Sequence, residues 1–381
     1  MWVVGSLILS QTTAVQAQPA VTSTGLQWMA FSDTYFQESI HNPHERTQFA
    51  AHRGAVRYNR FAINCLGVYA QFHSQRFGAK VKITPYETFP GSTCAPFKAY
   101  ALWTPTPGVE LTFGKFPTFF GVEAVESWEN FNYTRGAVAV LAQPDAFAGM
   151  RLEFRATEKF GMNLLITNGP DLGHDNNQLL SFGAQAVFQP SPYFTAKLGY
   201  LGGPEEPESF HDHNTGMSVP NLGYEERWTH RGDLVLEAAI GAVALKLNGV
   251  LGVRLEPGRD AHTPAPPDPA AENFFALAAS GRISVSDTMS FSLRGEYISD
   301  PKRWLYQPNL ALEHPFEPLT GYFATVTLEY IPFPDVGNPV IRWDNRFELV
   351  SESMYYIGNQ QHELSRNWFG SILGIVVHLH G

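Results

Sequence analysis

Apolar and polar residues alternate one by one along many segments of the chain. In residues 341–349 the apolar side chains Ile341, Trp343, Phe347 and Leu349 fall on one side of an extended backbone, and charged residues occupy most positions between them. Residues 150–155, 290–297 and 325–330 show the same pattern. Successive side chains of a strand point to opposite faces, so the pattern predicts β-strands. Alternation alone fits either a soluble sandwich with an apolar core or a membrane barrel with an apolar outer wall.

The predicted connections alternate between short turns and long loops. Short turns are expected near residues 74–76, 104–108, 157–159, 189–192, 239–241, 286–288 and 332–338, and long loops near 37–56, 87–96, 117–146, 169–179, 202–229, 254–273, 299–319 and 352–363. This predicts an all-β, transmembrane, antiparallel up-and-down β-barrel of about 16 strands, with 14 and 18 as neighbouring counts. Residues 133–140 could form a further strand, but we interpret them as part of the third long loop. Gathering all long loops at one end is typical of outer-membrane barrels and has no counterpart in a sandwich.

Composition excludes several other classes of protein. Only 16% of the 381 residues are charged and 13% are aromatic, yet the mean hydropathy is −0.16, too low for a bundle of membrane helices. The most apolar stretch, residues 234–253, carries Glu237 and Lys246 near its centre. A net charge of −10 argues against a nucleic-acid partner, which needs clustered positive charge.

The first seventeen residues resemble a secretory signal. A short apolar stretch is followed by Val15-Gln16-Ala17, with small residues at the positions that a signal peptidase requires. No Lys or Arg precedes the apolar stretch, so either the start of the signal is truncated, which we expect, or the segment is no signal. The expected organisation is a signal peptide over residues 1–17 and a single barrel domain over residues 18–381.

The run from Phe113 to Arg135 reads Gly-Lys-Phe, then Gly-x-Glu, an Asn and Tyr-Thr-Arg, and Pro144 and Gly149 follow it. It resembles the signature of the putative β-barrel porin-2 family, the OmpL-like porins of Gram-negative bacteria, in which Ser is usual at the position of Thr134. The resemblance extends from about Gly25 to the C-terminus. It implies a porin of the bacterial outer membrane, surrounded by lipid, through which small hydrophilic solutes diffuse passively. Homotrimers are common among the sixteen-stranded porins that the chain resembles, but an apolar outer face looks the same against lipid or a neighbouring copy, so the resemblance leaves the oligomeric state open.

By the same resemblance, the third long loop, residues 117–146, folds into the lumen and narrows it. Charged side chains would then line the constriction and set its selectivity. The candidates are Glu123, Glu126, Glu129 and Arg135 on the loop, and Arg151, Glu153, Arg155, Arg294, Glu296, Arg342, Asp344 and Arg346 on the wall. The hypothesis is an acidic loop that faces a basic ladder across the pore. The alternative is that these charges form structural pairs that only pin the loop.

Other candidate chemistry is sparse. His211 and His213 are weak candidates for a metal site, since imidazoles beside carboxylates suit divalent cations. Neither a nucleophile elbow nor a zinc-protease motif is present, so we expect no enzymatic activity and no cofactor. Cys65 and Cys94 lie in a predicted strand and a predicted loop, a placement that slightly disfavours a disulfide. The alternative to a porin is a plugged barrel that acts in binding or adhesion through its long loops, and a secreted sandwich ranks third.

Overall fold

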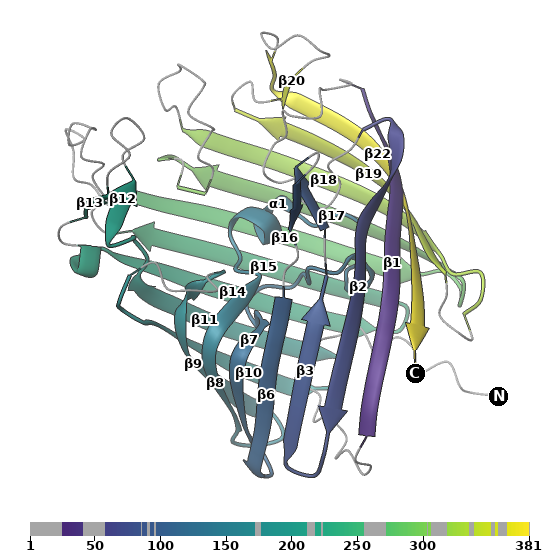
Figure 1. The fold of residues 1–381 in the computed structure, drawn as a ribbon. Helices are drawn as coiled ribbons and strands as arrows, with labels where there is room; N and C mark the ends of the chain where they lie inside the picture. The colour runs from purple at the N-terminus through teal and green to yellow at the C-terminus, as the bar shows by residue number, and fades with distance from the viewer. Residues whose placement is uncertain are drawn as a thin grey trace.

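The strands form a closed antiparallel barrel (Figure 1). The computed structural model describes residues 25–40, 58–84, 86–89, 92–94, 97–171, 177–211, 218–221, 224–254, 272–302, 304–305, 318–334, 339–351, 355–356 and 364–380. The predicted signal peptide lies outside them. No helix in these ranges is long and apolar enough to cross a bilayer.

Sixteen strands make the wall, as the alternation predicted. They are β1 Gly25–Ser39, β2 Arg60–His73, β3 Phe77–Ile83, β6 Phe97–Thr106, β7 Val109–Pro117, β8 Ala146–Arg155, β9 Phe160–Pro170, β10 Ser181–Ser191, β11 Phe194–Pro204, β14 Trp228–Ile240, β15 Val243–Arg254, β16 Glu272–Ser284, β17 Met289–Asp300, β18 Leu319–Tyr330, β19 Val340–Val350 and β22 Asn367–His380. Short strands lie within the connections: β4 Tyr86–Phe89, β5 Ser92–Cys94, β12 Ser209–His211, β13 Ser218–Pro220, β20 Tyr355–Tyr356 and β21 Leu364–Ser365.

The first and last strands pair and close the wall. The register of β1 with β22 runs from Met29 opposite His380 to Ser39 opposite Gly370. The start of β1 at Gly25 and the end of β22 at His380 therefore lie at the end of the barrel where the short turns join the strands, and the strand ends that lead into the long connections lie at the other (Figure 1). Because every wall strand has two neighbours, none of the sixteen described strands is an edge strand.

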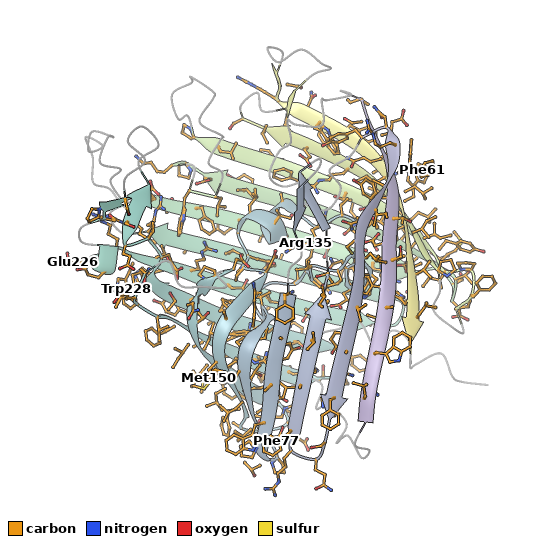
Figure 2. The ribbon with its side chains drawn as sticks, viewed as in Figure 1. Phe61, Phe77, Arg135, Met150, Glu226 and Trp228 are labelled. Carbon is orange, nitrogen blue, oxygen red and sulfur yellow. The ribbon has the colours of Figure 1, made fainter. Side chains whose placement is uncertain are left out.

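The charged faces of the strands point inward, which excludes the soluble sandwich. On β19, Arg342 and Glu348 are buried, whereas Trp343 and Phe347 are about half exposed, at 50% and 48%. The same holds around the barrel, and Figure 2 shows Phe61, Phe77 and Met150 on its outside. Apolar side chains outside and charges inside are the arrangement expected of a wall in lipid around a polar interior.

The third long connection folds into the interior. This segment, residues 118–145, is called L3 below. It contains the 3-10 turn η2 Ser127–Glu129 and the helix α1 Ala137–Leu141, so residues 133–140 are confirmed as loop and not strand. A second 3-10 turn, η3 Tyr224–Glu226, lies outside L3 in the fifth long connection. Of the two cysteines, Cys65 is buried and free, and nothing is described of the Cys94 side chain.

Candidate pore and its inward loop

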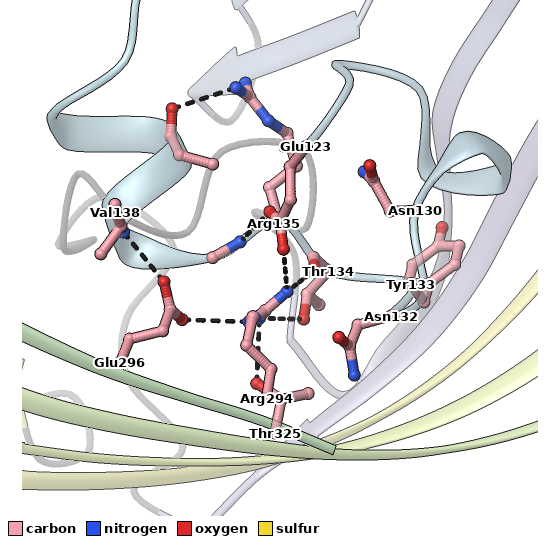
Figure 3. A network of polar contacts seen from close by, with 12 residues as sticks. Glu123, Asn130, Asn132, Tyr133, Thr134, Arg135, Val138, Arg294, Glu296 and Thr325 are labelled. Atoms are coloured by element: carbon pink, nitrogen blue, oxygen red, sulfur yellow. Dashed lines mark hydrogen bonds and ion pairs between the residues drawn. The ribbon is translucent and has the colours of Figure 1, made fainter. Parts of the chain in front are cut away.

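L3 leaves β7, crosses the interior and docks on the opposite wall, where Arg294 of β17 is its central contact (Figure 3). The Arg294 guanidinium donates to the backbone oxygen of Thr134 at 2.7 Å and to the Glu123 carboxylate at 2.9 Å, both on L3. It also donates to Glu296 at 3.0 Å and Thr325 at 2.9 Å on the wall. Arg294 is 1% exposed. Charge-assisted bonds of this kind are about twice as strong as neutral ones, so Arg294 fixes the loop to the wall.

Asp344 of β19 is a second polar anchor. Its carboxylate accepts hydrogen bonds from the backbone N–H groups of Tyr133 and Thr134, at 3.1 and 2.8 Å, and from the Thr134 hydroxyl at 2.8 Å. On the same strand, Arg346 donates to the backbone oxygen of Arg135 at 2.8 Å and Arg342 donates to that of Ser127. The β19 charges therefore satisfy the polar backbone of L3, which no secondary structure pairs there.

The helix α1 is held by both polar and apolar contacts. Glu296 accepts from the N–H of Val138 at 2.9 Å, and Glu123 accepts from the N–H of Gly136 at 2.7 Å. Val138 is fully buried in a cluster with inward-facing apolar side chains of β15 to β22, among them Phe274 and Trp368. Apolar side chains that face the polar interior of a barrel are stabilised only where something covers them, so this cluster accounts for the docking of α1.

The end of L3 nearer β1 is anchored through Asp33. The hydroxyl groups of Tyr133 and Ser127 donate to this buried carboxylate at 2.6 and 2.7 Å. The Tyr133 ring lies against β22 at Gly374, where an added Cβ would come within 2.2 Å of the ring. Gly374 is therefore required by the close approach of the loop to the wall.

A cavity of about 1270 Å³ remains between L3 and the wall of β1 to β11, with Lys246 of β15 at its border. It extends from the short turns at residues 74–76 and 104–108 to residues 118–126 of L3. Of the predicted pore residues, six line it: Glu123, Glu126, Glu129, Arg151, Glu153 and Arg155. The other six, Arg135, Arg294, Glu296, Arg342, Asp344 and Arg346, lie outside its lining, and Arg135 pairs with Asp145 at 2.7 Å. The geometry of the other five, all on the wall, is that of the alternative in which wall charges pin the loop.

The basic side chains that do line the cavity include five lysines that the sequence reasoning missed: Lys80, Lys82, Lys98, Lys197 and Lys246. The signal was present in the sequence. In residues 79–83 two lysines alternate with Ala79, Val81 and Ile83, which places them on the inner face by the same parity rule.

Two L3 carboxylates are held ionised by basic partners. Burial by itself would raise the pKa of Glu123, but Arg294, the N–H of Gly136 and Arg135 outweigh it and lower the pKa. Burial likewise opposes the lowered pKa of Glu126, and Lys82 at 2.5 Å outweighs it. Both side chains therefore carry their negative charge at neutral pH.

Glu129 behaves differently. Its confinement inside the barrel and the neighbouring charge of Glu126 raise its pKa above the ordinary value, and Lys82 and Lys98 offset this only in part. Of the three glutamates of L3, Glu129 is therefore the one that takes up a proton first as the pH falls.

The weak metal candidates gain no support from the structure. His213 lies outside the described residues, and nothing is described of the His211 side chain. Within the described ranges no group of three or more His, Cys, Asp or Glu side chains is placed to hold a metal ion.

Comparisons with known proteins agree with this geometry. The model of the family described as "Putative beta-barrel porin-2, OmpL-like" matches residues 25–377. No curated protein matches the sequence. Among solved structures, the fold is similar to an anion-selective porin from Comamonas acidovorans (TM-score 0.57, 9% identity, covering 94% of this chain and 100% of that one). It is also similar to the outer membrane channel DcaP of Acinetobacter baumannii (0.56, 9%, 94% and 98%) and to the trimer form of OmpT of Vibrio cholerae (0.55, 10%, 94% and 100%). At such identities these structures establish the fold alone.

Proposed function

The chain belongs to the putative beta-barrel porin-2, OmpL-like family, and from that premise we propose that small hydrophilic solutes and ions diffuse through the cavity between L3 and the wall. As a member of this family it is a porin of the bacterial outer membrane. The observation that carries the proposal is the cavity itself, which is lined by charged side chains and reaches from the short turns to L3. Membership of a porin family supports a channel and not an enzyme.

L3 is proposed as the constriction of this channel. Glu123, Glu126 and Glu129 would present negative charge to a solute, and the lysines of β3 and β6 would present positive charge across from them. Oppositely charged walls create a transverse field that favours polar solutes over apolar ones. The acidic loop of the sequence hypothesis is kept in this proposal, but the basic side chains across the cavity from it are the lysines of β3 and β6. The charges of β17 and β19 lie beneath the loop and hold it in place.

The assembly is proposed as a homotrimer with the exposed apolar outer wall as its surface. One similar structure is described as a trimer form. Sedimentation of the detergent-solubilised protein tests this, since a mass of one chain per particle would contradict it.

Planar-bilayer conductance of the refolded chain from Gln18 onward tests the proposed function. Stable conductance steps with a reproducible reversal potential in two salt gradients are expected. A competing function, binding or adhesion by a plugged barrel, is favoured by the apolar cluster that holds α1 inside the barrel. A chain that folds in detergent and never conducts would establish the plugged barrel instead.

The raised pKa of Glu129 predicts a pH-dependent selectivity. As the pH falls from neutral, Glu129 is neutralised at a higher pH than an ordinary glutamate, so the cation-to-anion permeability ratio should fall in that range. In Glu129→Gln the ratio should already be lower at neutral pH and should change less on acidification. Reversal potentials measured between pH 7.5 and 4 check this. Because His73 also lines the cavity and titrates in this range, the substitution His73→Gln is introduced into both proteins, with and without Glu129→Gln, before they are compared. Equal pH profiles of the two would contradict the assignment of the pH dependence to Glu129.

A further inference from the structure

Three lysines of the cavity converge on one patch of the wall. Lys82 of β3 is the direct register partner of Lys98 on β6. Lys80 precedes Lys82 by two positions and so shares its face. Side chains opposite one another on paired strands have Cβ atoms about 5 Å apart, and side chains two positions apart on one strand are separated by about 7 Å. All three line the cavity, so their ammonium groups form one positive cluster on its surface.

Only one of the three has a carboxylate partner among the described residues. Lys82 pairs with Glu126 at 2.5 Å. For Lys80 and Lys98, no described carboxylate lies within ion-pair distance. Lys98 is 4% exposed, yet it borders the cavity. A buried ammonium beside a second one is costly unless an opposite charge compensates it.

Among the described side chains, the carboxylates that attract Lys80 and Lys98 from a distance, chiefly Glu110 and Glu126, are each paired with another basic group. Arg151 lies between Glu110 at 3.5 Å and Glu153 at 3.6 Å, so these two carboxylates are already shared with a guanidinium. Over the whole lining, eight Lys and Arg side chains stand against six Asp and Glu side chains. The lining of the cavity thus carries an excess of basic side chains, whereas the whole chain carries an excess of acidic ones and a net charge of −10.

We propose that Lys80 and Lys98 form a binding subsite for the oxyanion group of a small solute, a carboxylate or a phosphate, and that the channel passes anions in preference to cations. The inference rests on the proposed function, since it names the solute class of the same channel. Each ammonium is a compact charge with three rotatable donors, unlike the planar fork of an arginine. Such a site holds an oxyanion without fixing its orientation, and permeation requires binding that is favourable enough for entry and weak enough for release.

Reversal potentials in a potassium chloride gradient test the inference. The unchanged protein should prefer chloride. Lys98→Gln should lower the anion-to-cation ratio by about threefold or more, because one charge is removed a few ångströms from the ion path, and Lys80→Gln with Lys98→Gln should lower it further. Lys98→Arg should retain the preference. The matched control is Lys159→Gln, an exposed lysine in the turn between β8 and β9, which should leave the ratio unchanged. A cation preference in the unchanged protein, or equal ratios in Lys98→Gln and Lys159→Gln, would overturn the inference.

Binding of inorganic phosphate separates this inference from the proposed function. Phosphorus-31 line broadening with the detergent-folded protein should reveal exchange that is lost in the double variant and kept in Lys159→Gln. Phosphate binding without any conductance would refute the open pore and leave the subsite intact, whereas conductance without phosphate binding would refute the subsite. Folding is checked by the different gel migration of unboiled and boiled samples. The variants should pass, since removal of Lys98 relieves its repulsion from Lys82.

Discussion

Replacing Arg294 with methionine should release L3 from the barrel wall and raise the single-channel conductance several-fold. The substitution leaves the carboxylates of Glu123 and Glu296 buried without their shared guanidinium, and it frees the backbone oxygen of Thr134. Removal of one partner from a buried charge network costs about 3–5 kcal/mol. That cost falls on the docked position of L3, because the two carboxylates regain water when the loop leaves the wall, so the loop should populate positions away from the wall. Planar-bilayer measurements should show conductance steps of larger amplitude and with more current noise than those of the unchanged protein.

The control for Arg294 is another arginine of the wall. Arg254 pairs with Glu272 on the adjacent strand, and its guanidinium lies over the ring of Trp304. Arg254→Met should therefore remove an ion pair of the wall and leave the conductance step unchanged. If Arg294→Met conducts like Arg254→Met while both fold, the apolar contacts of α1 would be sufficient to hold L3, and the polar anchor would be dispensable.

Replacing Ile375 with proline should abolish assembly of the barrel. Ile375 lies in the middle of β22, opposite Thr34 of β1 and Ile341 of β19. Proline has no N–H to donate and its ring disturbs a central strand, so the seam that closes the barrel would lose pairing where water cannot compensate for it. The expected result is no fast-migrating folded form in unboiled gel samples and no conductance.

Ile375→Thr is the matched control, because threonine keeps the N–H and a β-branched side chain. The Ile375 side chain faces outward and is 37% exposed. The threonine variant should assemble with at most a modest loss of yield. A proline variant that assembled and conducted as well as the threonine variant would show that the pairing of β22 is not needed at this depth.

The number of strands, and the face of each strand that points into the barrel, could be predicted from the sequence. Alternation assigns every side chain of a strand to one of two faces, and the spacing of turns and loops counts the strands. Exposed Trp343 beside buried Arg342 then decides between barrel and sandwich. The same alternation also places Lys80, Lys82 and Lys98 on the inner face.

The sequence by itself determined the barrel, its inward-facing charges and the acidic residues of its third loop. Only the tertiary structure decided what those charges contact. Parity places Arg294, Asp344 and Lys98 alike on the inner face, but the first two lie beneath L3 and the third borders the cavity. The difference arises because strands far apart in sequence stand on opposite sides of a closed wall. The side of the wall that the loop covers depends on where its polar backbone and α1 find partners across the lumen. A two-residue repeat within one strand carries no information about which distant strand faces the loop.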